Sequence, residues 1–352
     1  MTYLKTHPQL LQILQTKRKH NSVGDYLFRA WLLDHLATYK PWIAGDGNIV
    51  VKLGESRVAF SCHVDTCHSL KESDGTLQVV SEDMGVLFLG SDSRCLGADD
   101  GIGIFFMLQL IDAKIPGTYI FHTGEECGAE GSQSINRDCL HLTDTFDLIV
   151  AFDRAVLPGQ QPEIIITQSG TPCASEECGQ ALADALNAVE PDLGFVISHR
   201  GVFTDTLNYV DNVAQCLNVG CFYADQHTPG EFVDIEKVNM LLKAVLSISW
   251  DSLPTQRRAE LEFDKPWDFS TSAEEEDLYC ALTRAVDGCY GDLKEMTARV
   301  GAEVYGLDAD EAECYIKNRL LTKKLLKSSL ENFDGGAAAQ DVLLYIFDEA
   351  TK

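Results

Sequence analysis

Continuous apolar runs that alternate with helical segments limit the fold of this chain more than any other feature. The clearest runs are 57–66, 117–126 and 146–153. Runs of this length are typical of strands that are buried on both faces of a sheet. Apolar residues at helical spacing mark the segments 97–113, 174–189 and 233–253. The alternation predicts an α/β fold with a mixed, mostly parallel central sheet sandwiched by helices.

The helical patterns at the two ends of the chain suggest its domain organisation. Two helices, around Leu10 to Leu14 and Tyr26 to Leu33, precede the first strand pattern. Strand patterns stop before residue 264, and the segment 273–352 has only helical patterns, broken by Gly, Asp and Asn. We therefore expect one main domain over 1–264 and a helical domain or appendage over 265–352.

The chain is strongly acidic, with 28 Lys+Arg against 54 Asp+Glu and a formal net charge of -26 at pH 7. Nucleic acids and anionic membranes are bound through Lys and Arg that displace counterions from phosphate, so both are disfavoured as partners. No window approaches about 18 consecutive apolar residues, and the segment 1–21 lacks the pattern of a secretory signal. We expect a cytoplasmic protein.

The 12 cysteines are scattered through strand-like and helix-like segments. In a chain of this size, such scatter indicates buried free thiols and not a disulfide framework. No Cys-x-x-Cys occurs. A cysteine-based zinc site is therefore not expected.

Acidic and imidazole side chains recur where predicted strands end. His63 and Asp65 share one face of a strand end, because residues i and i+2 of a strand point the same way. Comparable positions are held by Asp99, Asp100, Glu125, Glu126, Asp153 and His227. The carboxyl ends of strands in an open α/β sheet form the edge where ligands bind, so we expect these groups to meet.

Crowded carboxylates repel one another unless a cation lies among them. Two histidines with several carboxylates suit a pair of Zn²⁺ ions, with Mn²⁺ or Co²⁺ as alternatives. Each segment alone could be a structural pair, a turn or a solvated strand end, and their conjunction favours the metal interpretation. The sequence has no Gly-x-Ser-x-Gly elbow for a nucleophilic serine and no Gly-x-x-x-x-Gly-Lys phosphate loop.

The motifs resemble those of the co-catalytic di-zinc peptidases, which include tripeptidases, leucyl and glutamyl aminopeptidases, carboxypeptidases and amino-acid deacylases. In chain order they are His-x-Asp at 63–65, Gly-Ala-Asp-Asp at 97–100, Gly-Glu-Glu-x-Gly-x-x-Gly at 124–131, Phe-Asp at 152–153 and His-Thr-Pro-x-Glu at 227–231. The Thr-Asp of GVFTDT also resembles a segment near the substrate site of the aminopeptidases. The resemblance covers residues 3–253 and implies a zinc-exopeptidase-like fold.

The resemblance also implies a role for each candidate residue. The implied metal ligands are His63 and Asp153 for one ion, Glu126 and His227 for the other, and Asp99 as the bridge. Asp65 would orient His63 by a hydrogen bond, and Asp100 would be structural. Because side chains alternate along a strand, Glu126 could face the metals while Glu125 acts as the catalytic base on a water.

The implied function is a metal-dependent exopeptidase, aminopeptidase or tripeptidase-like, that hydrolyses short peptides. An Asp at the position of Asp153 is more typical of the aminopeptidases. Two alternatives stay open: an N-acyl-amino-acid amidohydrolase, and a non-catalytic scaffold that works through 265–352.

Two departures from the resembled family concern the surroundings of the site. Gly101 stands where many relatives carry Lys or Arg. The distance from Asp153 to His227 is too short for the lid domain of some branches, so we expect a catalytic domain without a lid insertion. Assembly into an oligomer, for which the C-terminal helices are candidates, stays open.

Overall fold

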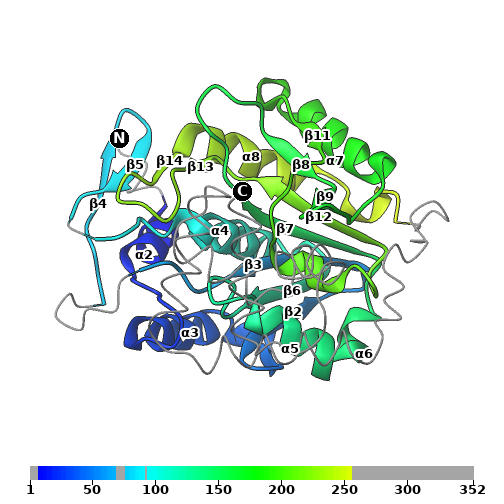
Figure 1. Cartoon of the computed structure of the whole chain (residues 1–352), viewed down its shortest axis with the longest axis horizontal. Coiled ribbons are helices and arrows are strands. Elements are labelled where there is room, and N and C mark those ends of the chain that lie inside the picture. The colour runs from blue at the N-terminus through cyan, green and yellow to red at the C-terminus, as the bar shows by residue number, and fades with distance from the viewer. Residues whose placement is uncertain (1–6, 69–75, 92, 256–352) are drawn as a thin grey trace, which may run out of the picture. The chain divides into compact units, whose positions relative to one another are not determined.

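The computed structural model of the chain describes residues 7–68, 76–91 and 93–255 (Figure 1). The helical appendage expected over 265–352 lies outside these residues, so its prediction stays untested. Within the described residues, no helix has the length and apolar character needed to cross a membrane. The nine described cysteines are all free thiols, as the sequence predicts.

An eight-stranded mixed sheet forms the centre of the described region. In spatial order its strands are β1 (Trp42–Ala44), β2 (Asn48–Leu53), β6 (Gly117–His122), β3 (Val58–His63), β7 (Leu148–Arg154), β12 (Gln215–Gly220), β8 (Glu163–Ile165) and β11 (Val196–Ser198). The four central strands β6, β3, β7 and β12 are parallel to one another. Their carboxyl ends therefore share one edge of the sheet.

The helices are α2 (Pro8–Gln15), α3 (Val23–His35), α4 (Ala98–Asp112), α5 (Glu130–Asp138), α6 (Leu140–Thr143), α7 (Glu176–Val189) and α8 (Ile235–Ser247). Short 3-10 turns are η1 (Ala37–Tyr39), η3 (Pro191–Leu193), η4 (Asp205–Tyr209) and η5 (Trp250–Ser252). The helix predicted over 233–253 is thus too long. Residues before Ile235 pair as a strand, and the Asp234 side chain caps α8 by accepting from the Lys237 N–H.

The side chains of the central strands alternate between two cores, as both faces of the sheet are covered. Phe60, Tyr119 and Phe152 belong to the larger core, together with α4 and α8. Their strand neighbours Ala59 and Ile120 belong to the smaller core, together with residues of α5 and α6. Figure 1 shows α4 and α8 on one side of the sheet and α5 and α6 on the other. The α/β sandwich expected from the apolar runs is present.

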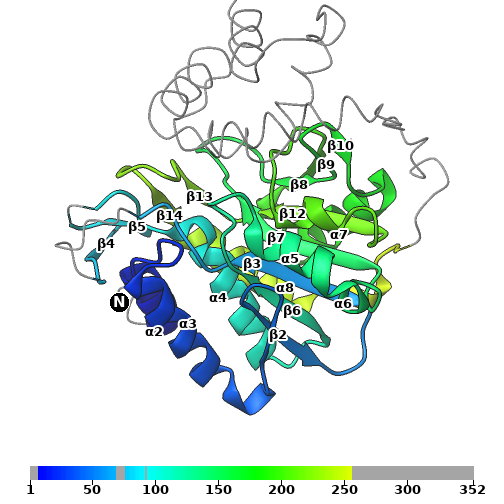
Figure 2. The same cartoon turned by 60° about the horizontal axis from the view of Figure 1, so that its bottom comes forward.

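A four-stranded antiparallel sheet lies beside α2 and α4 in both views (Figures 1 and 2). Its strands, in spatial order, are β13 (Tyr223–Ala224), β14 (Phe232–Asp234), β5 (Val86–Leu89) and β4 (Val80–Asp83). A separate two-stranded ribbon consists of β9 (Thr167–Gln168) and β10 (Thr171–Pro172). The four-stranded sheet thus brings together two segments that are far apart in the chain, 80–89 and 223–234.

In the β4–β5 hairpin, the polar residues that follow the strand-like run 76–80 in the sequence belong to β4. The turn is only Met84 and Gly85, both with positive φ (48° and 83°), so that the preceding residues can pair with β5. Residues 76–78 instead exchange main-chain hydrogen bonds with the end of α2, from Lys17 N to Thr76 O and from Gln78 N to Gln15 O.

Candidate metal centre

Two clusters of potential metal ligands lie at the carboxyl edge of the central strands. The first cluster consists of His63, Asp99 and Asp153, and the second of Cys67, Glu126 and His227. Within each cluster, one ligand atom from every residue lies within 4.8 Å of the others. Five of these six residues are the metal ligands predicted from the sequence, and Cys67 is the addition.

Asp99 connects the two clusters. Its Oδ1 lies 3.0 Å from His63 Nε2, and its Oδ2 lies 3.1 Å from His227 Nε2. Burial opposes ionisation of Asp99, but the two neighbouring imidazoles hold the pKa of its carboxyl well below the ordinary value. A carboxylate whose two oxygens face two different imidazoles has the arrangement of a bridging ligand.

Asp99 and His227 do not follow strands of the main sheet, contrary to the sequence prediction. Asp99 belongs to the first turn of α4, and its peptide bond to Asp100 is cis. His227 belongs to the loop between β13 and β14 and has a positive φ of 63°. Only the β3, β6 and β7 segments deliver site residues from strand ends, so a helix start and a loop complete the centre.

His63 is the last residue of β3 and is almost wholly buried. Its Nδ1 lies 3.0 Å from the main-chain carbonyl oxygen of Asp65. A carbonyl can only accept, so Nδ1 carries a hydrogen and Nε2 faces the carboxylates of Asp99 and Asp153, at 3.0 and 3.7 Å. A neutral imidazole would point its Nε2 lone pair at these anions, so this geometry requires a cation there, either a proton or a metal ion.

Asp153 is held from two sides. Thr204 Oγ1 donates to its Oδ2 at 2.6 Å, and Tyr223 OH donates to its Oδ1 at 3.0 Å. The Asn218 side chain accepts from the Asp153 N–H and donates to its carbonyl oxygen. The Thr204 contact uses the residue of GVFTDT that the sequence analysis had singled out. Tyr223 and Asn218 carried no motif signal.

Asp65 supports the site differently from the sequence prediction. Its carboxylate lies 3.8 Å from His63 Nδ1, and it is the main-chain oxygen that makes the hydrogen bond. The carboxylate accepts instead from the main-chain N–H groups of Glu125 and Glu126, both at 3.1 Å. Asp65 is therefore the residue that fixes the turn carrying the two glutamates.

Glu125 and Glu126 lie in this turn after β6 and not in the strand, so strand alternation does not separate their side chains. Burial raises the pKa of the Glu125 carboxyl well above its ordinary value, with Asp153 and Glu126 adding to the effect and His63 opposing it. Cations beside it would lower this pKa again. The protonation state of Glu125 therefore depends on the charges at this centre.

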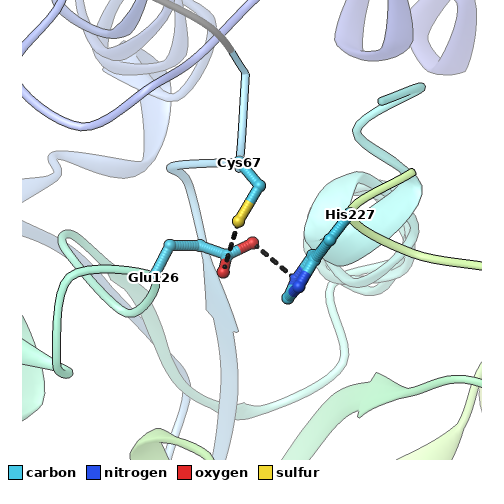
Figure 3. Close-up of side chains that lie close together, drawn as sticks. All are labelled: Cys67, Glu126 and His227. Carbon is cyan, nitrogen blue, oxygen red and sulfur yellow. Dashed lines mark hydrogen bonds and ion pairs between the residues drawn. The ribbon is translucent and has the colours of Figure 1, made fainter. Parts of the chain in front are cut away.

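The second cluster is arranged around the Glu126 carboxylate (Figure 3). His227 Nε2 lies 3.0 Å from its Oε1, and the Cys67 thiol donates to its Oε2 at 3.0 Å. His227 Nε2 is buried and close to two carboxylates, yet it lacks the alignment of a hydrogen bond to either. Such an imidazole nitrogen fits a metal ligand better than a hydrogen-bonded pair.

Glu231 fixes the start of α4. Its buried carboxylate accepts from the main-chain N–H groups of Leu96, Gly97 and Asp99, at 2.8, 2.9 and 3.0 Å. Burial raises the pKa of Glu231 to about 7, against the opposing effect of these hydrogen bonds. Glu231 closes the His-Thr-Pro-x-Glu motif, so the segment that supplies His227 also orients Asp99.

Asp100 has the structural role that the sequence suggested. Its Oδ2 accepts from the His63 N–H at 3.2 Å, and its Oδ1 accepts from the Gly103 N–H at 2.9 Å. It thereby joins the end of β3 to the first turn of α4. Gly103 is required here, since a Cβ at this position would lie 2.4 Å from the Asp100 carboxylate oxygens.

The donor set fits divalent metals. The first cluster offers one imidazole and two carboxylates, and the second offers an imidazole, a carboxylate and a thiol, with Asp99 shared. Nitrogen, oxygen and sulfur donors in this mixture suit Zn²⁺. The lone pair of His63 directed at carboxylates and the unaligned His227 Nε2 are both accounted for by cations between the groups.

Comparisons with known proteins agree on the fold. No protein-family model and no curated protein matches the chain, but solved structures do. The aminopeptidase PepT of Bacillus cereus aligns with a TM-score of 0.51 and 14% identity, over 68% of this chain and 95% of its own. A tripeptidase of Staphylococcus aureus aligns with the same TM-score, identity and coverage. A TET aminopeptidase from a marine sediment archaeon of the Thaumarchaeota aligns with a TM-score of 0.53 and 12% identity, over 73% of this chain and 99% of its own.

The chain has the fold of these peptidases. The alignments cover nearly the whole length of each solved structure, so the similarity is not confined to a common sheet core. The α/β fold predicted from the motifs is therefore confirmed, and it is the fold of these peptidases.

Proposed function

We propose that the protein is a di-metal exopeptidase, aminopeptidase or tripeptidase-like, that hydrolyses short peptides with Zn²⁺ as the preferred ion. The observation that carries the proposal is Asp99, whose two carboxylate oxygens face His63 and His227 in two separate ligand clusters. The three solved structures compared above are two aminopeptidases and a tripeptidase, which supports peptide hydrolysis as the reaction.

The residues of the chain have two kinds of role, holding the ions and supporting the ligands. His63 and Asp153 would hold one ion, Glu126 and His227 the other, and Asp99 both. Two bound divalent ions would polarise the scissile carbonyl and lower the pKa of an attacking water. Asp65 and Glu231 act on main-chain N–H groups, and so fix the turn of Glu125 and Glu126 and the start of α4. The ligands are therefore held before a substrate arrives.

Glu125 is the proposed general base and acid. It would take a proton from the attacking water and deliver it to the leaving amine. Its half-buried position, with carboxyl neighbours that favour its protonated form, suits a group that must hold a proton between the two steps.

The test is hydrolysis by the full-length chain loaded with Zn²⁺, with Mn²⁺ and Co²⁺ in parallel. Three versions of each tripeptide are compared: free at both ends, acetylated at the N-terminus, and amidated at the C-terminus. An aminopeptidase releases the first residue from the free and the amidated peptides, and acetylation blocks it. Cleavage of the acetylated peptides alone would favour an amidohydrolase, and no cleavage with any of the three metals would overturn the proposal.

Glu125→Gln tests the assigned base. We expect kcat to fall by about 10²- to 10⁴-fold, since the amide cannot carry the proton, while the metal content stays at two ions per chain. Glu130→Gln is the matched control, because Glu130 lies on the same segment but its side chain is 58% exposed. Near-normal turnover by Glu125→Gln would show that another group is the base.

A further inference from the structure

The Cys67 thiol belongs to the second cluster, where the sequence predicted Glu126, His227 and the bridging Asp99 as ligands. Cys67 follows four residues after His63, on the segment that continues β3. Its Sγ is 3.0 Å from Glu126 Oε2, while Oε1 of the same carboxylate is 3.0 Å from His227 Nε2. Figure 3 shows the thiol and the imidazole directed at the two oxygens of one carboxylate.

The spacing of these atoms suits a single ion. Ligand atoms around a tetrahedral zinc with bonds of about 2.0 to 2.3 Å lie about 3.3 to 3.8 Å apart. The thiol sulfur, one Glu126 oxygen and the His227 nitrogen all lie within 4.8 Å of one another, and the closest pairs are 3.0 Å apart. Asp99 Oδ2, at 3.1 Å from His227 Nε2, completes four donors.

We propose that Cys67 is a thiolate ligand of the second metal, which gives this centre one sulfur-containing and one sulfur-free site. This inference rests on the proposed function, because it requires the second ion to bind. When the ion binds, the S–H bond of Cys67 is replaced by a sulfur–metal bond and the proton is released to solvent; no oxidant or reductant is involved.

A thiolate ligand changes which metals the second site prefers. Sulfur is a soft donor that favours Zn²⁺, Co²⁺ and Cd²⁺ over Mn²⁺, whereas carboxylate and imidazole accept Mn²⁺ readily. The first cluster has no sulfur donor among its three residues. We therefore expect Mn²⁺ to occupy the first site and to fill the second one poorly.

Cys127 provides a matched control. It follows Glu126 directly and, like Cys67, is a half-buried free thiol, but it does not belong to the cluster. A serine at either position keeps a small polar side chain. Only Cys67→Ser should alter the metal centre.

The experiment uses the full-length chain, Cys67→Ser and Cys127→Ser, each loaded with Co²⁺. A thiolate bound to Co²⁺ gives a near-ultraviolet charge-transfer band that nitrogen and oxygen ligands do not produce. We expect this band in the wild type and in Cys127→Ser and its loss in Cys67→Ser. With Zn²⁺, X-ray absorption should detect a sulfur neighbour at about 2.3 Å in the first two proteins only.

Metal titration gives a second readout that does not depend on catalysis. Cys67→Ser should bind the weaker of two Zn²⁺ ions at least about 10- to 100-fold less tightly, the range found when groups supporting a metal site are removed. If Cys67→Ser keeps the band, or if a wild type that binds two ions lacks it, Cys67 is not a ligand. The proposed function is unaffected by either result. A wild type that binds no metal would overturn both this inference and the proposed function.

Discussion

The two clusters of candidate ligands are connected by Asp99 but are held in different ways. In the first, His63 ends a central strand with a side chain only 2% exposed, and Asp153 accepts hydrogen bonds from Thr204 and Tyr223. In the second, the ligands come from a turn and two loop segments, and the His227 side chain is 19% exposed. The first cluster is therefore attached to strands of the main sheet, whereas the second is formed by connecting segments.

The difference indicates where each site obtains its rigidity. The first cluster depends on strand packing and on donors to Asp153. The second depends on two carboxylates that accept hydrogen bonds from main-chain N–H groups. Asp65 holds the turn of Glu125 and Glu126, and Glu231 holds the start of α4. Most substitutions should therefore weaken metal binding at one site only. A substitution that acts on Asp99, which both sites share, should weaken both.

Asp99→Ala should have the largest effect, because it removes the bridge and takes one carboxylate neighbour from each of the two histidines. We expect loss of both ions and of all measurable hydrolysis. Metal analysis of the purified variant checks this expectation. Retention of two tightly bound ions would mean that neither site needs Asp99, and would contradict its role as the bridge.

His227→Ala should empty only the second site. The variant is expected to bind one ion per chain and to lose most of its hydrolysis, while the ion at His63 and Asp153 stays. Calorimetric titration with Zn²⁺ measures the number of sites directly. His63→Ala is the reciprocal variant, and loss of the same ion in both would contradict the assignment of the histidines to different sites.

Glu231→Gln should weaken metal binding without removing a ligand. An amide has one acceptor oxygen where the carboxylate has two, so it cannot satisfy the three N–H groups of Leu96, Gly97 and Asp99. We expect affinity to fall by about 10- to 100-fold, as for other groups that orient metal ligands. The effect should fall on both ions, since Glu231 positions the bridge, and a change confined to one ion would argue against this role.

Thr204→Val should have the smallest effect and should be confined to the first site. It removes the 2.6 Å hydrogen bond to Asp153 Oδ2 and leaves the bond from Tyr223 in place. Hydrogen bonds to charged groups contribute about 1.5 to 3 kcal/mol. Because Tyr223 still holds Asp153, we expect the low end of this range, which is a loss of about tenfold in affinity for the first ion. Competition with a chelator measures it, and an equal loss at the second ion would show that the two sites are not held separately.

The sequence determined the strands and most of the candidate ligands. Continuous apolar runs identify β3, β6 and β7 because strands buried on both faces need apolar residues at every position. His63, Glu126 and Asp153 follow those strands closely, so their meeting at one edge could be predicted from parallel topology. The motifs added Asp99 and His227, whose positions no periodicity predicts.

The tertiary structure decided how those groups are oriented and which others join them. Tyr223 and Cys67 lie at the centre although neither residue belongs to one of the motifs. The buried Arg18, which donates to the carbonyl oxygens of Val64 and Gly97, fixes the approach of β3 to the start of α4. These contacts join residues far apart in the chain, and a single hydrogen bond between distant segments leaves no periodic pattern in either one. Local periodicity therefore predicted the layers of the fold, and only packing in three dimensions could assign the thiol and the supporting carboxylates.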